Sequence, residues 1–134
     1  LGFGNLGLVL YETDVRFRAP AGAPDLVYRP EILYFAAARA SQIQGRIEIE
    51  PDLIVEVISP DSRSLDTQTK LGDYERAGVR EYWLIDPIDE RMTFYRLRDG
   101  KFVEAPASSS RYESLVVPDF SLDLELVRAA VRAL

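Results

Sequence analysis

Short apolar segments, separated by polar and turn-forming residues, run along the first third of the chain and predict β-strands. "GLVLYE" (7–12) and "DVRFR" (14–18) have the β-branched and aromatic residues that are typical of paired strands. "APAGAPD" (19–25) has the composition of a turn, and "RPEILYFAA" (29–37) is the next predicted strand. Residues 36–45 are expected to form a short helix or a loop.

A strand, a helix and a second strand are predicted next along the chain. They cover residues 52–59 ("DLIVEVIS"), about 65–77, and 79–87 ("VREYWLIDP"). Ser62 or Ser64 can cap the amino end of the helix, and Gly78 is suited to end it. A helical connection of this length usually joins two parallel strands of one sheet.

The last third of the chain predicts a hairpin and a terminal helix. "RMTFYRLRDGKFVEAP" (91–106) forms the hairpin with "RDGK" as its turn, and a polar loop that leads into a short strand follows at 108–117. Residues 121–134 are expected to form an amphipathic helix, because Leu124, Val127 and Val131 are near helical spacing.

Together these elements predict an α/β (α+β) fold with a mixed central sheet flanked by helices. No internal repeat or linker divides the chain, so we expect a single domain over residues 1–134. The sequence begins in mid-pattern without an initiator Met. We therefore expect it to lack an amino-terminal segment of the full-length protein.

Composition narrows the possible chemistry. Cys and His are both absent from the 134 residues, which rules out disulfides, Ser-His-Asp triads and His-ligated zinc within this chain. Carboxylates with a hard cation such as Mg²⁺ fit the residues that remain. The net charge of −6 argues against a nucleic-acid coat but permits an enzyme that meets phosphates through a metal. No apolar run is long enough to span a bilayer, so we expect no membrane partner and a cytoplasmic location.

Glu56 stands in the middle of an apolar strand. Side chains alternate along a strand, so Glu56 shares a face with Ile54 and Ile58. Burying a carboxylate costs several kcal/mol unless the carboxylate is paired. Three explanations are open: Glu56 lies in water on an edge strand, it pairs with an arginine, or it binds a metal ion with other carboxylates.

Glu31 and Asp52 share a sequence context, in which a proline precedes an acid at the start of an apolar strand. If the two strands are neighbours, the two acids lie at corresponding ends and can join Glu56 in holding a divalent cation. Taken alone, Glu31 is equally well explained as an ordinary charge at the start of a strand.

Lys70 is predicted on the same helix face as Tyr74 and Ala77, at positions i, i+4 and i+7. If Tyr74 packs inward, the Lys70 ammonium can reach the carboxylates of the neighbouring strand. The alternative is an exposed lysine paired with Asp66, four residues earlier.

The segment "PDLIVEVISPDSRSLDTQTKLGDYERAGVREYWLIDP" (51–87) closely resembles the core of the Uma-type restriction endonucleases, a bacterial family within the PD-(D/E)XK nuclease superfamily. The shared pattern is an apolar strand that begins with an acid and ends in Ser-Pro, a helix with Lys, Tyr and Gly, and then Glu-Tyr-Trp and Asp-Pro. "RPEILYF" (29–35) stands where these proteins have a "PD" strand.

This resemblance implies a restriction-endonuclease-like core that hydrolyses phosphodiester bonds of DNA with Mg²⁺, for which Mn²⁺ can substitute. Glu31 then takes the place of the first acid and Glu56 that of the (D/E)XK acid, and both would bind the metal. Asp52 is a further ligand or a structural residue. Lys70 replaces the lysine that the family pattern places at Ile58.

The chain departs from that pattern in having Glu31 instead of Asp and Ile58 instead of Lys, and it lacks a further acid expected near the amino terminus. A second function therefore stays open: a catalytically inactive nuclease fold that serves as a DNA-binding or protein-interaction module. Tyr82 and Trp83 are expected in the core or at a dimer contact, and a homodimer is a further prediction.

Overall fold

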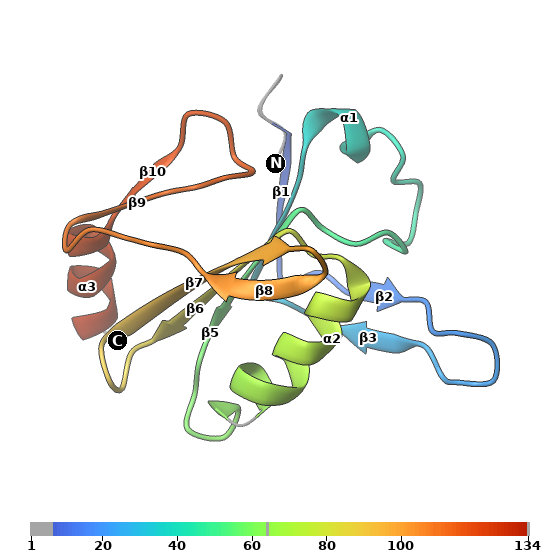
Figure 1. The fold of residues 1–134 in the computed structure, drawn as a ribbon, viewed down its shortest axis with the longest axis horizontal. Helices are drawn as coiled ribbons and strands as arrows, with labels where there is room; N and C mark the ends of the chain where they lie inside the picture. Colours follow the sequence, from blue (N-terminus) through green and yellow to red (C-terminus); the bar gives the residue numbers. More distant parts are fainter. Residues whose placement is uncertain (1–6, 64, 134) are drawn as a thin grey trace.

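A six-stranded mixed sheet organises the protein, in a computed structural model that describes residues 7–63 and 65–133. The strand order is β1-β4-β5-β6-β7-β8, with β5 and β6 parallel and all other neighbours antiparallel (Figure 1). The strands are β1 (Leu8–Tyr11), β4 (Ile32–Phe35), β5 (Leu53–Val57), β6 (Glu81–Asp86), β7 (Arg91–Arg98) and β8 (Lys101–Glu104). The predicted α/β (α+β) fold with a mixed sheet is confirmed.

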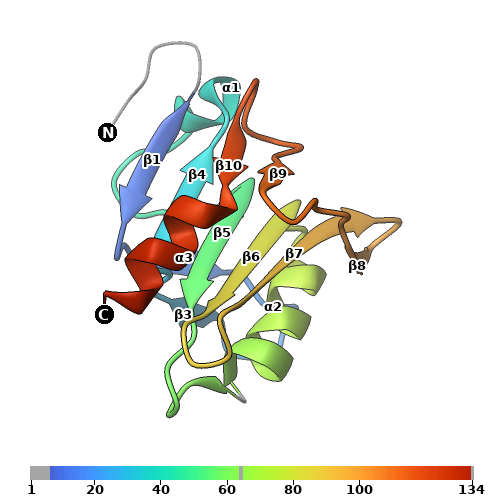
Figure 2. The ribbon, with the colours of Figure 1, turned by 90° about the vertical axis from the view of Figure 1, so that its left-hand side faces the viewer.

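Both faces of this sheet are covered, as Figure 2 shows for α2 and α3. One face carries a π-helix (Leu65–Thr69) that continues into α2 (Lys70–Ala77), together with the hairpin of β2 (Val15–Phe17) and β3 (Leu26–Tyr28). The other face carries α3 (Leu124–Arg132) and the pair β9 (Arg111–Glu113) and β10 (Ser121–Asp123). A short helix, α1 (Ala37–Ala40), follows β4.

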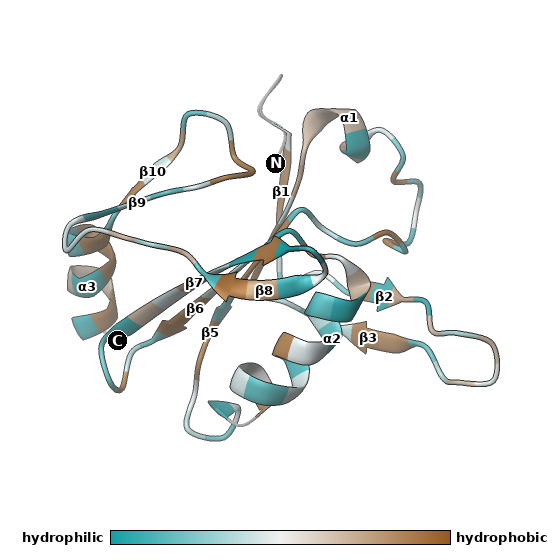
Figure 3. Ribbon diagram, viewed as in Figure 1, coloured by the Kyte–Doolittle hydropathy of each residue, from teal (hydrophilic) through white to brown (hydrophobic). Residues whose placement is uncertain are grey.

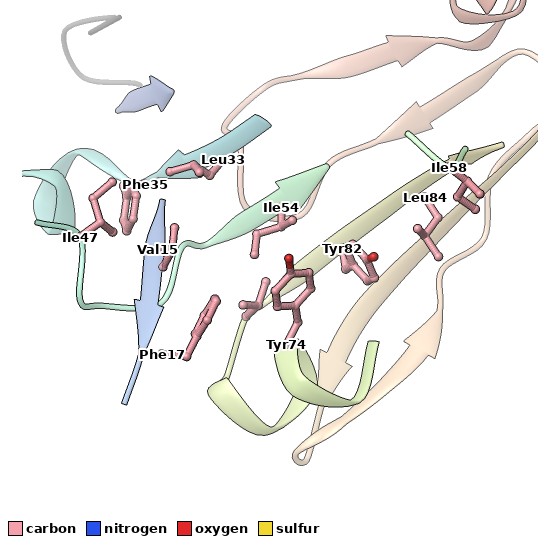
Figure 4. Close-up of a cluster of buried hydrophobic side chains, with 11 residues drawn as sticks. Val15, Phe17, Leu33, Phe35, Ile47, Ile54, Ile58, Tyr74, Tyr82 and Leu84 are labelled. Carbon is pink, nitrogen blue, oxygen red and sulfur yellow. The ribbon is translucent and has the colours of Figure 1, made fainter. Parts of the chain in front are cut away.

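Strand β5 divides its apolar side chains between two cores, because successive side chains point to opposite faces. Ile54 packs with Tyr74 of α2 in one core (Figure 4), while Leu53 and Val55 pack with Leu124 of α3 in the other. Figure 3 shows α2 changing between teal and brown along its length, as expected for a helix with one face on a sheet. The predicted burial of this strand on both faces is confirmed.

Several predicted elements occur close to their expected positions, but the first two strands do not pair with each other. The hairpin of β7 and β8 turns at Asp99 and Gly100, which both have positive φ, of 50° and 78°. Gly78 ends α2 with φ of 90°, as predicted, whereas Ser64 lies outside the described residues. The expected pairing of the first two strands is wrong, because β1 pairs with β4 and β2 pairs with β3.

A second buried glutamate, Glu81 on β6, fastens the carboxyl-terminal segment to the sheet. One oxygen accepts hydrogen bonds from the Ser114 hydroxyl (2.9 Å) and from the backbone N–H groups of residues 115 and 116. The other oxygen accepts from the Trp83 indole (2.7 Å) and the Tyr112 hydroxyl (2.5 Å). Both Tyr82 and Trp83 are buried, in different cores, so the core interpretation of these residues is confirmed.

Replacing Glu81 by Ala should lower the free energy of unfolding by about 4 kcal/mol, because several buried donors lose their acceptor at once. Urea denaturation followed by circular dichroism measures this change. Glu113→Ala, at an exposed position on β9, is the matched control and should shift the free energy by less than about 0.5 kcal/mol. Equal losses in the two variants would contradict the role given to Glu81.

Candidate functional site

Glu56 lies near the carboxyl end of β5, a strand that has β4 on one side and β6 on the other. Its side chain is on the α2 face of the sheet, and the residue is only 3% exposed. The edge-strand explanation is therefore wrong. A buried carboxylate in this position needs partners.

The Glu56 carboxylate is held from three directions. Its Oε2 accepts hydrogen bonds from the Lys70 ammonium and from the Tyr74 hydroxyl, each at 3.0 Å. Its Oε1 accepts the backbone N–H of Glu31 at 3.3 Å. The cation that meets this carboxylate is the helix lysine expected from the sequence, and its own side chain is 13% exposed.

Lys70 reaches the sheet because of how its helix begins. The π-helix ends at Thr69, so Lys70 is the first residue of α2, and Tyr74 follows one α-helical turn later on the same face. Tyr74 is fully buried, which confirms the predicted inward face of the helix. Asp66, the alternative partner of Lys70, has a side chain that lies outside the described part of the structure.

An ion pair anchors the segment that precedes the π-helix. Arg63 donates to both carboxylate oxygens of Asp86 at the end of β6, at 2.6 and 3.3 Å. Burial works to raise the pKa of Asp86, but the Arg63 hydrogen bond and the backbone N–H groups of residues 88 and 89 outweigh it and hold that pKa below its usual value. The connection from β5 to α2 is thus fixed at both ends, by Asp86 and by Glu56.

Tyr74 and Tyr28 enclose the pair of Glu56 and Lys70. Burial and the adjacent Glu56 charge raise the pKa of Tyr74, so its hydroxyl remains a hydrogen-bond donor. The ring centroid of Tyr28, a residue of β3, lies 5.5 Å from the Lys70 ammonium. Its hydroxyl donates to Asp73 at 2.5 Å, and burial together with this bond raises its pKa to about 12.

Glu31 lies beside Glu56 because β4 and β5 are antiparallel. Ile32 is paired with Val55, and continuing this register by one position sets Glu31 opposite Glu56. The Glu31 side chain is exposed. Glu12, at the end of β1, donates its backbone N–H to the Glu31 carbonyl at 3.1 Å and has a positive φ of 46°. We did not anticipate Glu12 from the sequence, where its position gives no signal.

Asp52 occupies the opposite end of β5 from Glu56. Its carboxylate accepts the backbone N–H of Ala36 at 2.7 Å and the Arg39 guanidinium at 3.0 Å, with Arg80 at 3.9 Å. The structure therefore brings together Glu31, Glu56 and Lys70 but leaves Asp52 apart. The expected alignment of Glu31 with Asp52 is wrong, because it required the two strands to start at the same end.

The acidic side chains at this site can be compared with the ligands that a divalent cation requires. Within residues 7–63 and 65–133, no three acidic side chains gather closely enough to hold a metal ion. Mg²⁺, however, is commonly bound through one or two carboxylates, with water and substrate phosphate as its other ligands. The buried carboxylate of Glu56 beside the exposed Glu31 fits that smaller requirement.

Comparisons with known proteins bear on the family and the fold of this chain. The model of the family Uma2, described as "Putative restriction endonuclease", matches residues 2–127. A solved structure described as a "putative nuclease belonging to DUF820", from Anabaena variabilis, aligns with a TM-score of 0.75 at 17% identity, over 96% of this chain and 71% of that one. No curated protein matches the chain. Among the described residues, no helix is long and apolar enough to cross a membrane.

Replacing Lys70 by Met should lower the free energy of unfolding by about 3 kcal/mol, because the buried Glu56 charge loses its cation. Lys101→Met is the matched control: Lys101 is 80% exposed and lies 3.8 Å from Glu75, so its loss should cost less than about 0.5 kcal/mol. Urea denaturation of both variants measures the difference. If Lys70→Met is as stable as Lys101→Met, the ion pair does not hold the site.

Proposed function

We propose that this chain, which belongs to the Uma2 family of restriction endonucleases, is a Mg²⁺-dependent nuclease that hydrolyses phosphodiester bonds of DNA. The observation that carries the proposal is the meeting of Glu31, Glu56 and Lys70 at one end of β5. Carboxylates that bind a metal ion, with a lysine close to them, are the groups that metal-assisted phosphodiester hydrolysis can use. The family match and the nuclease-like fold of the solved structure support the same function.

Glu56 and Glu31 would hold the cation in this proposal. Glu56 Oε2 accepts from Lys70 and Tyr74, and Oε1 accepts the Glu31 N–H at 3.3 Å on the side of β4. A carboxylate oxygen has two lone pairs, so an oxygen that accepts a hydrogen bond can also coordinate a metal ion. When bound, the cation supplies Lewis acidity, which draws charge from the scissile phosphate. Mn²⁺ shares the preference for oxygen ligands and should substitute.

Lys70 contributes positive charge close to the reacting phosphate. Its ammonium is partly exposed and is held by Glu56 on one side and by the Tyr28 ring on another. From there it can neutralise the charge that develops on the phosphate oxygens in the transition state, or position the attacking water. Asp52 has a supporting role in this scheme, since its carboxylate is occupied by Arg39 and a backbone N–H.

A catalytically inactive protein with this fold would use the contacts of Glu56 in a different way. If the fold serves only as a DNA-binding or protein-interaction module, the bonds among Glu56, Lys70 and Tyr74 act solely as core packing. Loss of the Glu56 charge would then change stability without any dependence on metal.

Replacing Glu56 by Gln should reduce cleavage of plasmid DNA at least ~100-fold, because the amide binds a divalent cation poorly and no longer balances Lys70. It should also abolish the rise of several degrees in melting temperature that saturating Mn²⁺ gives the wild type. Asp52→Asn is the matched control, with the same chemical change at the residue just before the same strand, and should keep the Mn²⁺-dependent rise. A wild type that neither cleaves DNA nor responds to Mn²⁺ would instead support the inactive module.

We further propose that two copies of the chain pair through α3, and that the protein acts in the cytoplasm, where a bacterial nuclease would meet its DNA substrate. Leu126 of α3 is 70% exposed and Phe120 is 40% exposed. Together with Val127 and Val131 they border an almost wholly apolar groove, and burial of such surface is what drives stable association.

Leu126→Lys should therefore convert a dimer to a monomer in size-exclusion chromatography with light scattering. Ala129→Lys adds the same charge at an exposed position of α3 outside that groove and should leave the dimer intact. A wild type that elutes as a monomer at all concentrations refutes the pairing but leaves the nuclease proposal unaffected.

A further inference from the structure

Tyr74 is placed to control the orientation of the Glu56 carboxylate. Its hydroxyl bonds to Oε2 at 3.0 Å, on the same oxygen as the Lys70 ammonium. With Oε2 engaged by two donors from α2, Oε1 is turned toward β4, where Glu31 N–H meets it. The two donors on α2 therefore fix the orientation of the Glu56 carboxylate, and that orientation determines where Oε1 lies relative to β4.

The Tyr74 ring is itself fixed by aromatic neighbours on β2, β3 and β6, of which Phe17 and Tyr82 are drawn in Figure 4. Its centroid lies 5.1 Å from that of Tyr82, 5.5 Å from that of Tyr28 and 5.6 Å from that of Phe17. The contacts with Tyr82 and Tyr28 are edge-to-face, which is a favourable geometry for aromatic pairs. The hydroxyl therefore has one stable position, and that position is at Glu56.

Tyr28 acts on the other member of the pair. Its ring face lies 5.5 Å from the Lys70 ammonium, within the range of a cation–π interaction, and its hydroxyl is tied to Asp73 on the same helix. Lys70 is thereby confined between a carboxylate and an aromatic ring, although a free lysine side chain has many rotamers. Tyr28 comes from the β2–β3 hairpin, which also supplies Phe17 to the surroundings of Tyr74.

We propose that Tyr74 and Tyr28 are positioning residues: Tyr74 orients the Glu56 carboxylate by its O–H, and Tyr28 confines the Lys70 ammonium by its ring. This inference rests on the proposed nuclease function. Neither tyrosine touches the substrate in this scheme. Supporting residues of this kind typically change metal affinity or rate by 10- to 100-fold when they are altered.

The first test removes only the Tyr74 oxygen. Tyr74→Phe should weaken Mn²⁺ binding, measured by isothermal titration calorimetry without DNA, by about tenfold or more. Tyr95→Phe is the matched control: Tyr95 stacks on Tyr82 in the same aromatic cluster but lies on β7, two strands from Glu56. If both variants bind Mn²⁺ like the wild type, or both weaken it equally, the role of Tyr74 is refuted.

The second test separates the ring of Tyr28 from its hydroxyl and does not depend on the folding of Tyr74→Phe. Tyr28→Leu should lower kcat for DNA cleavage about tenfold with little change in KM, because the ammonium loses its confinement. Tyr28→Phe keeps the ring and should retain the wild-type kcat. Equal kcat in the wild type and Tyr28→Leu would overturn the role of the ring.

The wild type separates failure of this inference from failure of the proposed function. If the wild type binds Mn²⁺ and cleaves DNA while the variants match their controls, only the positioning roles of Tyr74 and Tyr28 are refuted. If the wild type does neither, the nuclease proposal is refuted together with these positioning roles. Circular dichroism at the assay temperature establishes that each variant compared is folded.

Discussion

The antiparallel register between β4 and β5 is the constraint on which the candidate site depends. It sets the residue before β4 against the end of β5, so that Glu31 meets Glu56. The same register sends Asp52 to the far end of the sheet, where arginines neutralise it. Had the two strands been parallel, Glu31 and Asp52 would have been neighbours and Glu56 would have lacked its contact with Glu31. The placement of acids in this protein is therefore a property of strand direction more than of local sequence.

Two buried glutamates, one on each face of the sheet, show two ways of burying a charge. Glu81 is surrounded by neutral donors from the indole, hydroxyl and backbone groups near it, and this arrangement fastens the carboxyl-terminal segment. Glu56 instead accepts from a lysine, from a tyrosine and from the backbone N–H of Glu31 at 3.3 Å. The first arrangement leaves the carboxylate fully occupied. The second sets the carboxylate against the Lys70 ammonium and beside Glu31, at the site proposed here to hold a metal ion.

The local sequence pattern was sufficient to predict the strand that carries Glu56 and the helix that carries Lys70. Alternation identified the buried faces of β5, and helical spacing placed Lys70 and Tyr74 on one side. What failed was the pairing of strands distant in sequence, because the β2–β3 hairpin and the register of β4 arise from long-range packing. Tyr28 was missed for the same reason, since nothing near it in the chain indicates a lysine 42 positions later. Glu81 was overlooked because, apart from the Trp83 indole, its donors come from residues 112–116, which the sequence predicts only as part of a polar loop that leads into a short strand.

The π-helix at Leu65–Thr69 has a consequence for how this chain can vary. It connects two fixed points, the Arg63–Asp86 ion pair and the Lys70–Glu56 pair, and its wider turn holds one residue more than an α-helical turn would. Removing a single residue would leave an α-helical turn and rotate one anchor relative to the other by roughly 100°. The types of residue between the two ion pairs can vary, since much of this turn faces water. The number of residues between them cannot. Insertions and deletions in related chains should therefore collect in loops such as residues 19–25 and leave the spacing of Arg63 and Lys70 constant.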